Sequence, residues 1–109
     1  MVKRGEIWSA ATGSGYGGKP RPVLVVQGDA FGDTPHRLVA LCQTARGEAR
    51  DLRPRVLPDA QNGLEAISDV AVDILVTVDH QQFGRVIGRL SETDMQRVDQ
   101  ALLLILGFA

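Results

Sequence analysis

The chain has 109 residues, of which 44% are hydrophobic and 23% charged, and its formal net charge is −1 at pH 7. A chain of this length buries enough surface for one core and leaves no room for a separate cofactor domain, which excludes dehydrogenase, kinase and large barrel architectures. We therefore expect one domain over residues 1–109. Because Cys42 is the one cysteine, an internal disulfide and a cysteine-based zinc finger are excluded, and a cytoplasmic setting fits best. Every apolar run is far shorter than the roughly 20 residues that cross a bilayer, so we expect a soluble protein without a membrane partner.

The charge is distributed unevenly along the chain. Residues 1–55 hold nine Lys and Arg against five acidic residues, giving +4, whereas residues 56–109 hold three against eight, giving −5. Five arginines fall between Arg37 and Arg55. A basic stripe of this kind is typical of a nucleic-acid site, because each phosphate contact releases counterions. On charge alone, an ordinary solvated loop is an equally good interpretation.

The hydrophobic pattern predicts six strands and one terminal helix. The strands fall at 6–11, 21–27, 37–43, 53–57, 70–79 and 84–90, and the helix at 92–106. The second strand is apolar on both faces, as expected of a central strand, whereas the prolines around the fourth favour an edge. In the fifth, the alternation from Val70 to Val78 predicts a single buried face.

The predicted helix has recognisable ends. Ser91 is expected to cap its N-terminus and Gly107 to close its C-terminus. Met95, Val98, Leu102 and Ile105 recur at helical spacing, which predicts an apolar stripe packed on the sheet. Because the loops are too short for parallel crossovers, we expect an antiparallel α+β domain or a small, partly closed barrel.

Residues 13–18 read GSGYGG and satisfy the G-x-G-x-x-G pattern of dinucleotide sites. That site needs a helix directly after the glycines, to place free N–H groups against the pyrophosphate. Here Pro20 and Pro22 lead into a strand instead, so we reject the dinucleotide interpretation. The segment is expected to be a hairpin loop with Tyr16 at its centre, which either orders on a ligand or has no role beyond the connection.

Arg21 and Thr44 are the strongest candidates for chemistry. Arg21 lies at the mouth of an apolar strand between two prolines, where a planar, permanently charged guanidinium makes a good phosphate clamp. Thr44 would bring a hydroxyl to the same place if the second and third strands are neighbours. The alternatives are a surface arginine and a turn residue. A loop histidine is usually just solvated, Asp73 among valines needs a partner, and Cys42 reads as a small core residue.

Several segments together resemble one protein family. These are RGEIW at 4–8, the glycine loop, RPVLVV at 21–26, Thr44, VD at 72–73, TVD at 77–79 and GRVIGRLS at 84–91. In this order they resemble the MazF/PemK toxins of bacterial toxin–antitoxin pairs over nearly the whole chain. The resemblance implies a small SH3-like, partly closed barrel of the CcdB/PemK type with a C-terminal helix. It also implies a homodimer, metal- and cofactor-independent cleavage of single-stranded RNA at a short sequence, and inhibition by an antitoxin with a disordered acidic tail.

The resemblance also assigns roles to residues. It makes Arg21 and Thr44 the catalytic pair, which would hold the scissile phosphate while the neighbouring 2′-hydroxyl attacks, leaving a 2′,3′-cyclic phosphate and a 5′-hydroxyl. Four residues are expected to bind substrate: Tyr16 by stacking on a base, and Lys19, Gln43 and Arg46 near the phosphates. Arg21, Glu6, His36 and His80 are the candidates for the general base. Pro20 and Ile74 depart from the family pattern, which bears on the loop geometry and the cleavage sequence.

Two interpretations from other classes remain open at this point. A protein of the same fold could be a non-catalytic, CcdB-like toxin that inhibits DNA gyrase, or a plain barrel that binds RNA or a partner. The Arg21 and Thr44 pair favours the ribonuclease over the gyrase inhibitor, because a gyrase binder does not require it.

Overall fold

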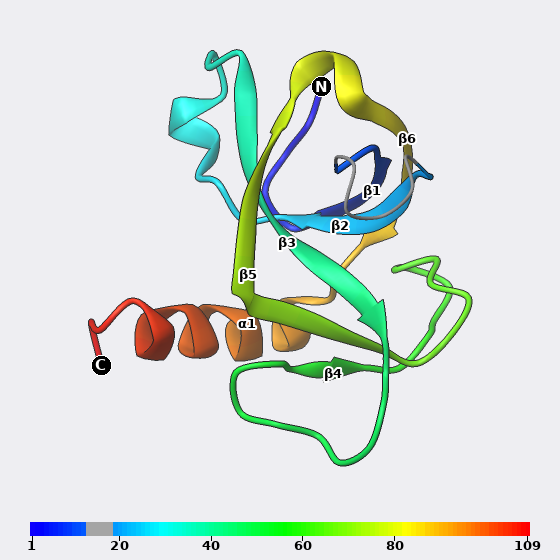
Figure 1. The fold of residues 1–109 in the computed structure, drawn as a ribbon, viewed down its shortest axis with the longest axis vertical. Helices are drawn as coiled ribbons and strands as arrows, with labels where there is room; N and C mark the ends of the chain where they lie inside the picture. Colours follow the sequence, from blue (N-terminus) through cyan, green and yellow to red (C-terminus); the bar gives the residue numbers. More distant parts are fainter. Residues whose placement is uncertain (13–18) are drawn as a thin grey trace.

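The computed structural model describes residues 1–12 and 19–109, which form one curled antiparallel sheet and a C-terminal helix (Figure 1). The strands are β1 (Glu6–Ala10), β2 (Arg21–Val25), β3 (His36–Thr44), β4 (Arg55–Val56), β5 (Ser68–Asp79) and β6 (Phe83–Arg89), followed by helix α1 (Glu92–Ile105). Two short 3-10 turns, η2 (Asp29–Phe31) and η3 (His80–Gln82), lie between them. Each predicted strand and the helix are confirmed, with ends that differ by at most two residues.

The strand order β4-β5-β3-β2-β1-β6 places β2 and β3 at the centre and β4 at an edge, as the sequence predicts. β2 is covered on both faces. Val23 and Val25 pack in one apolar cluster, while Leu24 packs in another, and none of the three is more than 1% exposed. The antiparallel α+β barrel expected from the short loops is therefore the fold of this chain.

β5 departs from the predicted single buried face. Ala40 and Leu41 are consecutive on β3, but their partners on β5 are Leu75 and Ala71, so residues 72–74 form a bulge. The extra residues are odd in number, and they reverse which face of the strand each later side chain occupies. The strand bends at this point (Figure 1).

The bend in β5 divides its apolar residues between the two cores. Val70 and Val72 pack with Leu24, Val98 and Ala101 in the helix-side cluster. Ile74 in the bulge, and Val76 and Val78 beyond it, pack in the second cluster with Val23 and Trp8. The prediction of one shared face was therefore wrong, because periodicity along a strand cannot show a bulge.

Helix α1 begins and ends as predicted. Ser91 caps it, its hydroxyl oxygen accepting a hydrogen bond from Asp94 N at 3.1 Å, and Gly107 closes it with φ +83°. Val98 and Ala101 are buried against the sheet. Ile105 was expected to join them but is 40% exposed, because the last turn of α1 runs past the sheet (Figure 1).

The connection between β4 and β5 links the two edges of the sheet. Arg89 N, on edge strand β6, donates to Gln61 O at 3.0 Å. The backbones approach so closely that a Cβ on Gly88 would lie 2.3 Å from Asn62 O. Asn62 is fully buried, and its side chain holds the connection through hydrogen bonds with Asp59 N, Leu64 N and Leu57 O. This contact partly closes the barrel.

Candidate active site

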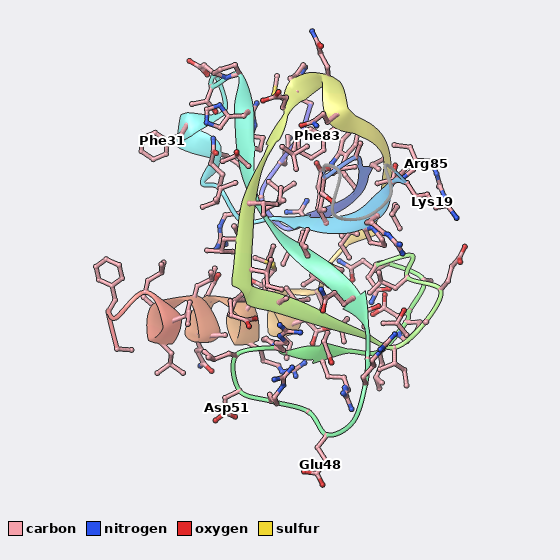
Figure 2. All side chains as sticks on the ribbon, in the orientation of Figure 1. Lys19, Phe31, Glu48, Asp51, Phe83 and Arg85 are labelled. Atoms are coloured by element: carbon pink, nitrogen blue, oxygen red, sulfur yellow. The ribbon has the colours of Figure 1, made fainter. Side chains whose placement is uncertain are left out.

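An open cavity of about 950 Å³ lies at the end of the sheet where β2 begins and β3 ends. Five arginines and two carboxylates contribute to its lining: Arg21, Arg46, Arg50, Arg53 and Arg85, with Glu65 and Asp69. The loop between β3 and β4, which carries Arg46, Arg50 and Arg53, also contains Glu48 and Asp51, whose side chains project away from the protein (Figure 2). The cavity is therefore a positively charged surface although the chain as a whole is slightly acidic.

Arg21 and Thr44 both line this cavity. Arg21 is the first residue of β2 and Thr44 the last residue of β3, and the two strands are antiparallel neighbours in the sheet. Both side chains are exposed and both line the cavity. The condition set by the sequence, that the second and third strands pair, is met.

Two of the four expected substrate-binding residues line the cavity. Gln43 and Arg46 line the cavity. Lys19 is exposed and does not contribute to the lining, although its side chain projects on the same side of the molecule as that of Arg85 (Figure 2). Tyr16, with the rest of residues 13–18, lies outside the described part of the chain.

Three of the four general-base candidates lie elsewhere. His36 begins β3, and Thr44 ends it eight residues later, so the two are about 25 Å apart along the strand. His80 lines a second cavity of about 600 Å³ near the start of β3. The Glu6 carboxylate accepts hydrogen bonds from Trp8 Nε1 at 3.1 Å and from Lys3 N at 2.7 Å. Arg21 is therefore the one member of that group on the cavity surface.

An ion pair between β4 and β5 holds the loop that carries Arg46. Arg55 donates to both carboxylate oxygens of Asp69, from Nε at 2.9 Å and from Nη2 at 3.2 Å. The same guanidinium donates to the carbonyl oxygens of Arg46 and Gly47. Hydrogen bonding by Arg55 lowers the pKa of Asp69. The loop is thus fixed to the rim of the sheet at its backbone, which leaves the Arg46 side chain exposed to solvent.

A second arginine–aspartate pair lies on the β5 bulge. Arg53 Nε and Nη2 donate to the two carboxylate oxygens of Asp73 at 3.0 and 3.1 Å. This hydrogen bonding lowers the pKa of Asp73, so the carboxylate stays charged at neutral pH. The sequence predicted that Asp73 would need a partner, and an arginine fills that role.

Sequence reasoning missed Arg85 and Glu65 as cavity residues. Arg85 comes from β6 and Glu65 from the connection between β4 and β5, which meet because that connection closes onto β6. Neither residue has a local pattern that marks it. Charge in a predicted loop or strand was the one available signal, and it is shared by many surface residues.

Cys42 is buried in the helix-side core, and its burial raises the thiol pKa to about 12. Its interpretation as a core residue is confirmed. Within residues 1–12 and 19–109, no group of three or more His, Cys, Asp or Glu side chains could hold a metal ion. The same part of the chain contains no helix of the length and hydropathy needed to cross a bilayer.

A family model described as PemK-like, MazF-like toxin of type II toxin–antitoxin systems matches residues 3–106. The chain belongs to this family. A probable endoribonuclease MazF of Mycolicibacterium smegmatis is 42% identical over 108 residues, covering 99% of each chain. The endoribonuclease EndoA of Bacillus subtilis is 32% identical, covering 98% of this chain and 96% of its own.

The fold is also that of solved relatives. An endoribonuclease from a mycobacterial species, determined in complex with its cognate antitoxin, superposes with a TM-score of 0.84 and covers 100% of this chain and 98% of its own. Its sequence identity is 19%, so this likeness concerns the fold. The curled antiparallel sheet with a C-terminal helix is therefore the architecture expected from the resemblance.

Proposed function

We propose that this MazF-like toxin cleaves single-stranded RNA in the arginine-lined cavity. The observation that carries the proposal is the placement of Arg21 and Thr44 at adjacent strand ends on one cavity surface. Relatives named endoribonucleases match almost the full chain, which supports the same conclusion.

The reaction uses a nucleophile that RNA already carries. The 2′-hydroxyl attacks the adjacent phosphorus, the bond to the 5′-oxygen breaks, and the products are a 2′,3′-cyclic phosphate and a 5′-hydroxyl. Arg21 holds the scissile phosphate and stabilises the negative charge that develops on it, and Thr44 donates a hydrogen bond to a non-bridging oxygen. Such preorganised donors contribute most in the transition state, where the charge on the phosphorane is largest.

Two protons must move during this reaction. A guanidinium keeps its proton in proteins and is a poor base, so Arg21 is better suited to charge stabilisation than to proton removal. Asp69 is held by Arg55 and is equally unsuited. Glu65 is the remaining carboxylate of the cavity and makes no ion pair with any described residue. We assign it the role of proton acceptor for the 2′-hydroxyl, and water in this open cavity the role of proton donor to the departing 5′-oxygen.

The end of α1 supports a homodimer. Its last turn and the residues after it expose a row of large apolar side chains, from 40% for Ile105 to 79% for Phe108. Several large exposed apolar side chains gathered at one end of an element are typical of an interaction site. A dimer would also give the substrate a longer groove than one small protomer offers. Light scattering on the purified protein should report twice the protomer mass.

The cavity suits an acidic antitoxin segment for the same reason that it suits RNA. Its arginines are arranged to meet negative charge, and the mycobacterial structure with the related fold contains a cognate antitoxin. We expect a disordered, acidic antitoxin tail to compete with RNA there, in the cytoplasm where both molecules occur. Its binding should weaken with salt in parallel with RNA binding.

Incubation with a long single-stranded RNA in the presence of a chelator tests the proposal. We expect discrete fragments whose 5′ ends accept phosphate from a kinase without prior dephosphorylation, because they carry a 5′-hydroxyl. Intact RNA together with inhibited DNA supercoiling would instead support a gyrase-directed toxin. Intact RNA that is bound without either effect would support a plain binding barrel.

A further inference from the structure

Gln43 lines the cavity beside Thr44 and is bound to one of the cavity arginines. It is the penultimate residue of β3, directly before Thr44, and its half-buried side chain lines the cavity. Its carbonyl oxygen Oε1 accepts a hydrogen bond from Arg53 Nη1 at 3.0 Å. Arg21 and Thr44, to which the proposed reaction assigns the phosphate, line the same cavity.

The contact with Arg53 decides which way the Gln43 amide points. A guanidinium donates hydrogen bonds and accepts none, so the amide atom that faces it must be the oxygen. The amino group Nε2 is then directed away from Arg53. Among the described residues, none accepts a hydrogen bond from Gln43 Nε2. The carbonyl oxygen of Gln43 is therefore held at Arg53, and its two amide N–H donors remain for a ligand in the cavity.

Arg53 is itself held in position, which keeps the amide in this orientation. Two of its nitrogens bind the two oxygens of Asp73, at 3.0 and 3.1 Å, and the third binds Gln43. The network joins β3, the segment before β4 and the bulge of β5. Because a planar, bidentate pair restricts rotation of the guanidinium, the donor pattern of Gln43 is preorganised before any RNA binds.

We propose that Gln43 is a specificity-determining residue that reads one base flanking the cleaved bond and selects uracil or guanine over cytosine or adenine. Uracil and guanine present a carbonyl oxygen at the exocyclic position where cytosine and adenine present an amino group. A fixed N–H donor forms a hydrogen bond with that carbonyl oxygen, and it is opposed by the N–H donors of the amino group. This inference rests on the proposed ribonuclease activity, and it assigns part of the substrate sequence that the activity requires.

The test compares cleavage-site profiles of the wild type and Gln43→Glu on a pool of random RNA, by sequencing the 5′ ends of the fragments. The carboxylate keeps the acceptor for Arg53 but replaces the N–H donors by another acceptor. We expect the wild type to prefer uracil or guanine at one position by about tenfold or more, and Gln43→Glu to shift that position toward cytosine or adenine. The other positions of the recognised sequence should not change.

Two variants separate this role from a structural one. Gln81→Glu makes the same substitution beside the distant smaller cavity and should leave the profile unchanged. Asp73→Asn releases Arg53 and should broaden the preference at the Gln43 position while kcat on the preferred sequence stays close to the wild-type value. Thermal unfolding should show that all three variants fold.

Binding measured without cleavage keeps the two proposals distinguishable. In the Arg21→Ala background, short uridine oligomers should bind more tightly than cytidine oligomers, and Gln43→Glu should remove the difference. A wild type that cuts RNA but selects cytosine or adenine at every recognised position would overturn the inference. So would a profile that Gln43→Glu leaves unchanged. A wild type that cuts no RNA would instead contradict the proposed function, and equal binding of both oligomers would then reject the role of Gln43 as well.

Discussion

The two ends of strand β3 use arginine in opposite ways. Near its start, Arg37 is 5% exposed and donates to the carbonyl oxygens of Gly32, Thr34 and His36, so that its charge organises the loop around it. At its other end, Thr44 lines the arginine-rich cavity, and four of the five arginines there, Arg21, Arg46, Arg50 and Arg85, are exposed. An arginine whose donors are taken by backbone carbonyls is a structural element, whereas exposed arginines held on a fixed loop are available to phosphate.

The same contrast separates the two cavities. The smaller one contains His80, Asp33 and Asp79 beside Arg37, and so combines both signs of charge around a buried cation. The larger one contains five arginines and two carboxylates, of which Asp69 is paired with Arg55. We therefore expect substitutions at the larger cavity to change the cleavage or binding of RNA, and substitutions at the smaller cavity to leave both unchanged.

Arg21→Ala is expected to have the largest effect. Loss of the group that holds the scissile phosphate should lower kcat for RNA cleavage by about a thousandfold, because one preorganised charge-stabilising donor is removed. His80→Ala is the matched control, since it removes a titratable side chain at the opposite end of β3. It should cleave at the wild-type rate. A large loss of cleavage in His80→Ala, or none in Arg21→Ala, would contradict the assignment of the active site.

Gly88→Ala tests the contact that closes the barrel beside the larger cavity. The new Cβ would lie 2.3 Å from Asn62 O, so the connection between β4 and β5 must move. We expect the free energy of unfolding in urea to fall by about 3 kcal/mol. Gly28→Ala is the control, because its Cβ would meet only the Phe31 ring at an ordinary 3.8 Å. That variant should be within about 0.5 kcal/mol of the wild type.

Asp69→Asn tests the ion pair that fixes the arginine loop. The variant loses the charge that Arg55 binds and should unfold a few degrees below the wild type at pH 7. Because the folded-state pKa of Asp69 is lowered, its stabilising effect is present above the unfolded pKa of about 4 and is lost as the pH falls through the folded value. The difference between the two melting temperatures should therefore shrink as the pH is lowered below 4. A constant difference would show that the charge is not responsible.

Arg46→Ala is expected to have the smallest effect. Each phosphate contact on single-stranded RNA contributes about 0.7 to the slope of log affinity against log salt concentration. Loss of one contact should lower the slope by that amount and weaken binding at low salt. Lys3→Ala removes a charge near the opposite end of the sheet, where Lys3 contacts Glu6 before β1 begins, and should leave the slope unchanged. Equal slopes for Arg46→Ala and the wild type would remove Arg46 from the binding surface.

The sequence by itself determined the strands, the helix and its caps, and marked Arg21 and Thr44 as residues at strand ends. These features depend on local propensity and on short connections, so residue patterns record them. The family resemblance predicted the type of fold and the candidate residues for RNA cleavage. The expectation that Asp73 needs a partner was also local, because an unpaired carboxylate among valines is costly.

Only the tertiary structure decided the rest. The β5 bulge redistributes its valines between two cores, and the closure of the β4–β5 connection onto β6 brings Glu65 and Arg85 to the cavity. Both depend on long-range register, which local periodicity does not encode. The structure also separated the histidines from the cavity by the length of β3 and oriented the Gln43 amide through Arg53. Distances and donor directions of this kind arise when strands distant in sequence pack together, so local sequence patterns do not predict them.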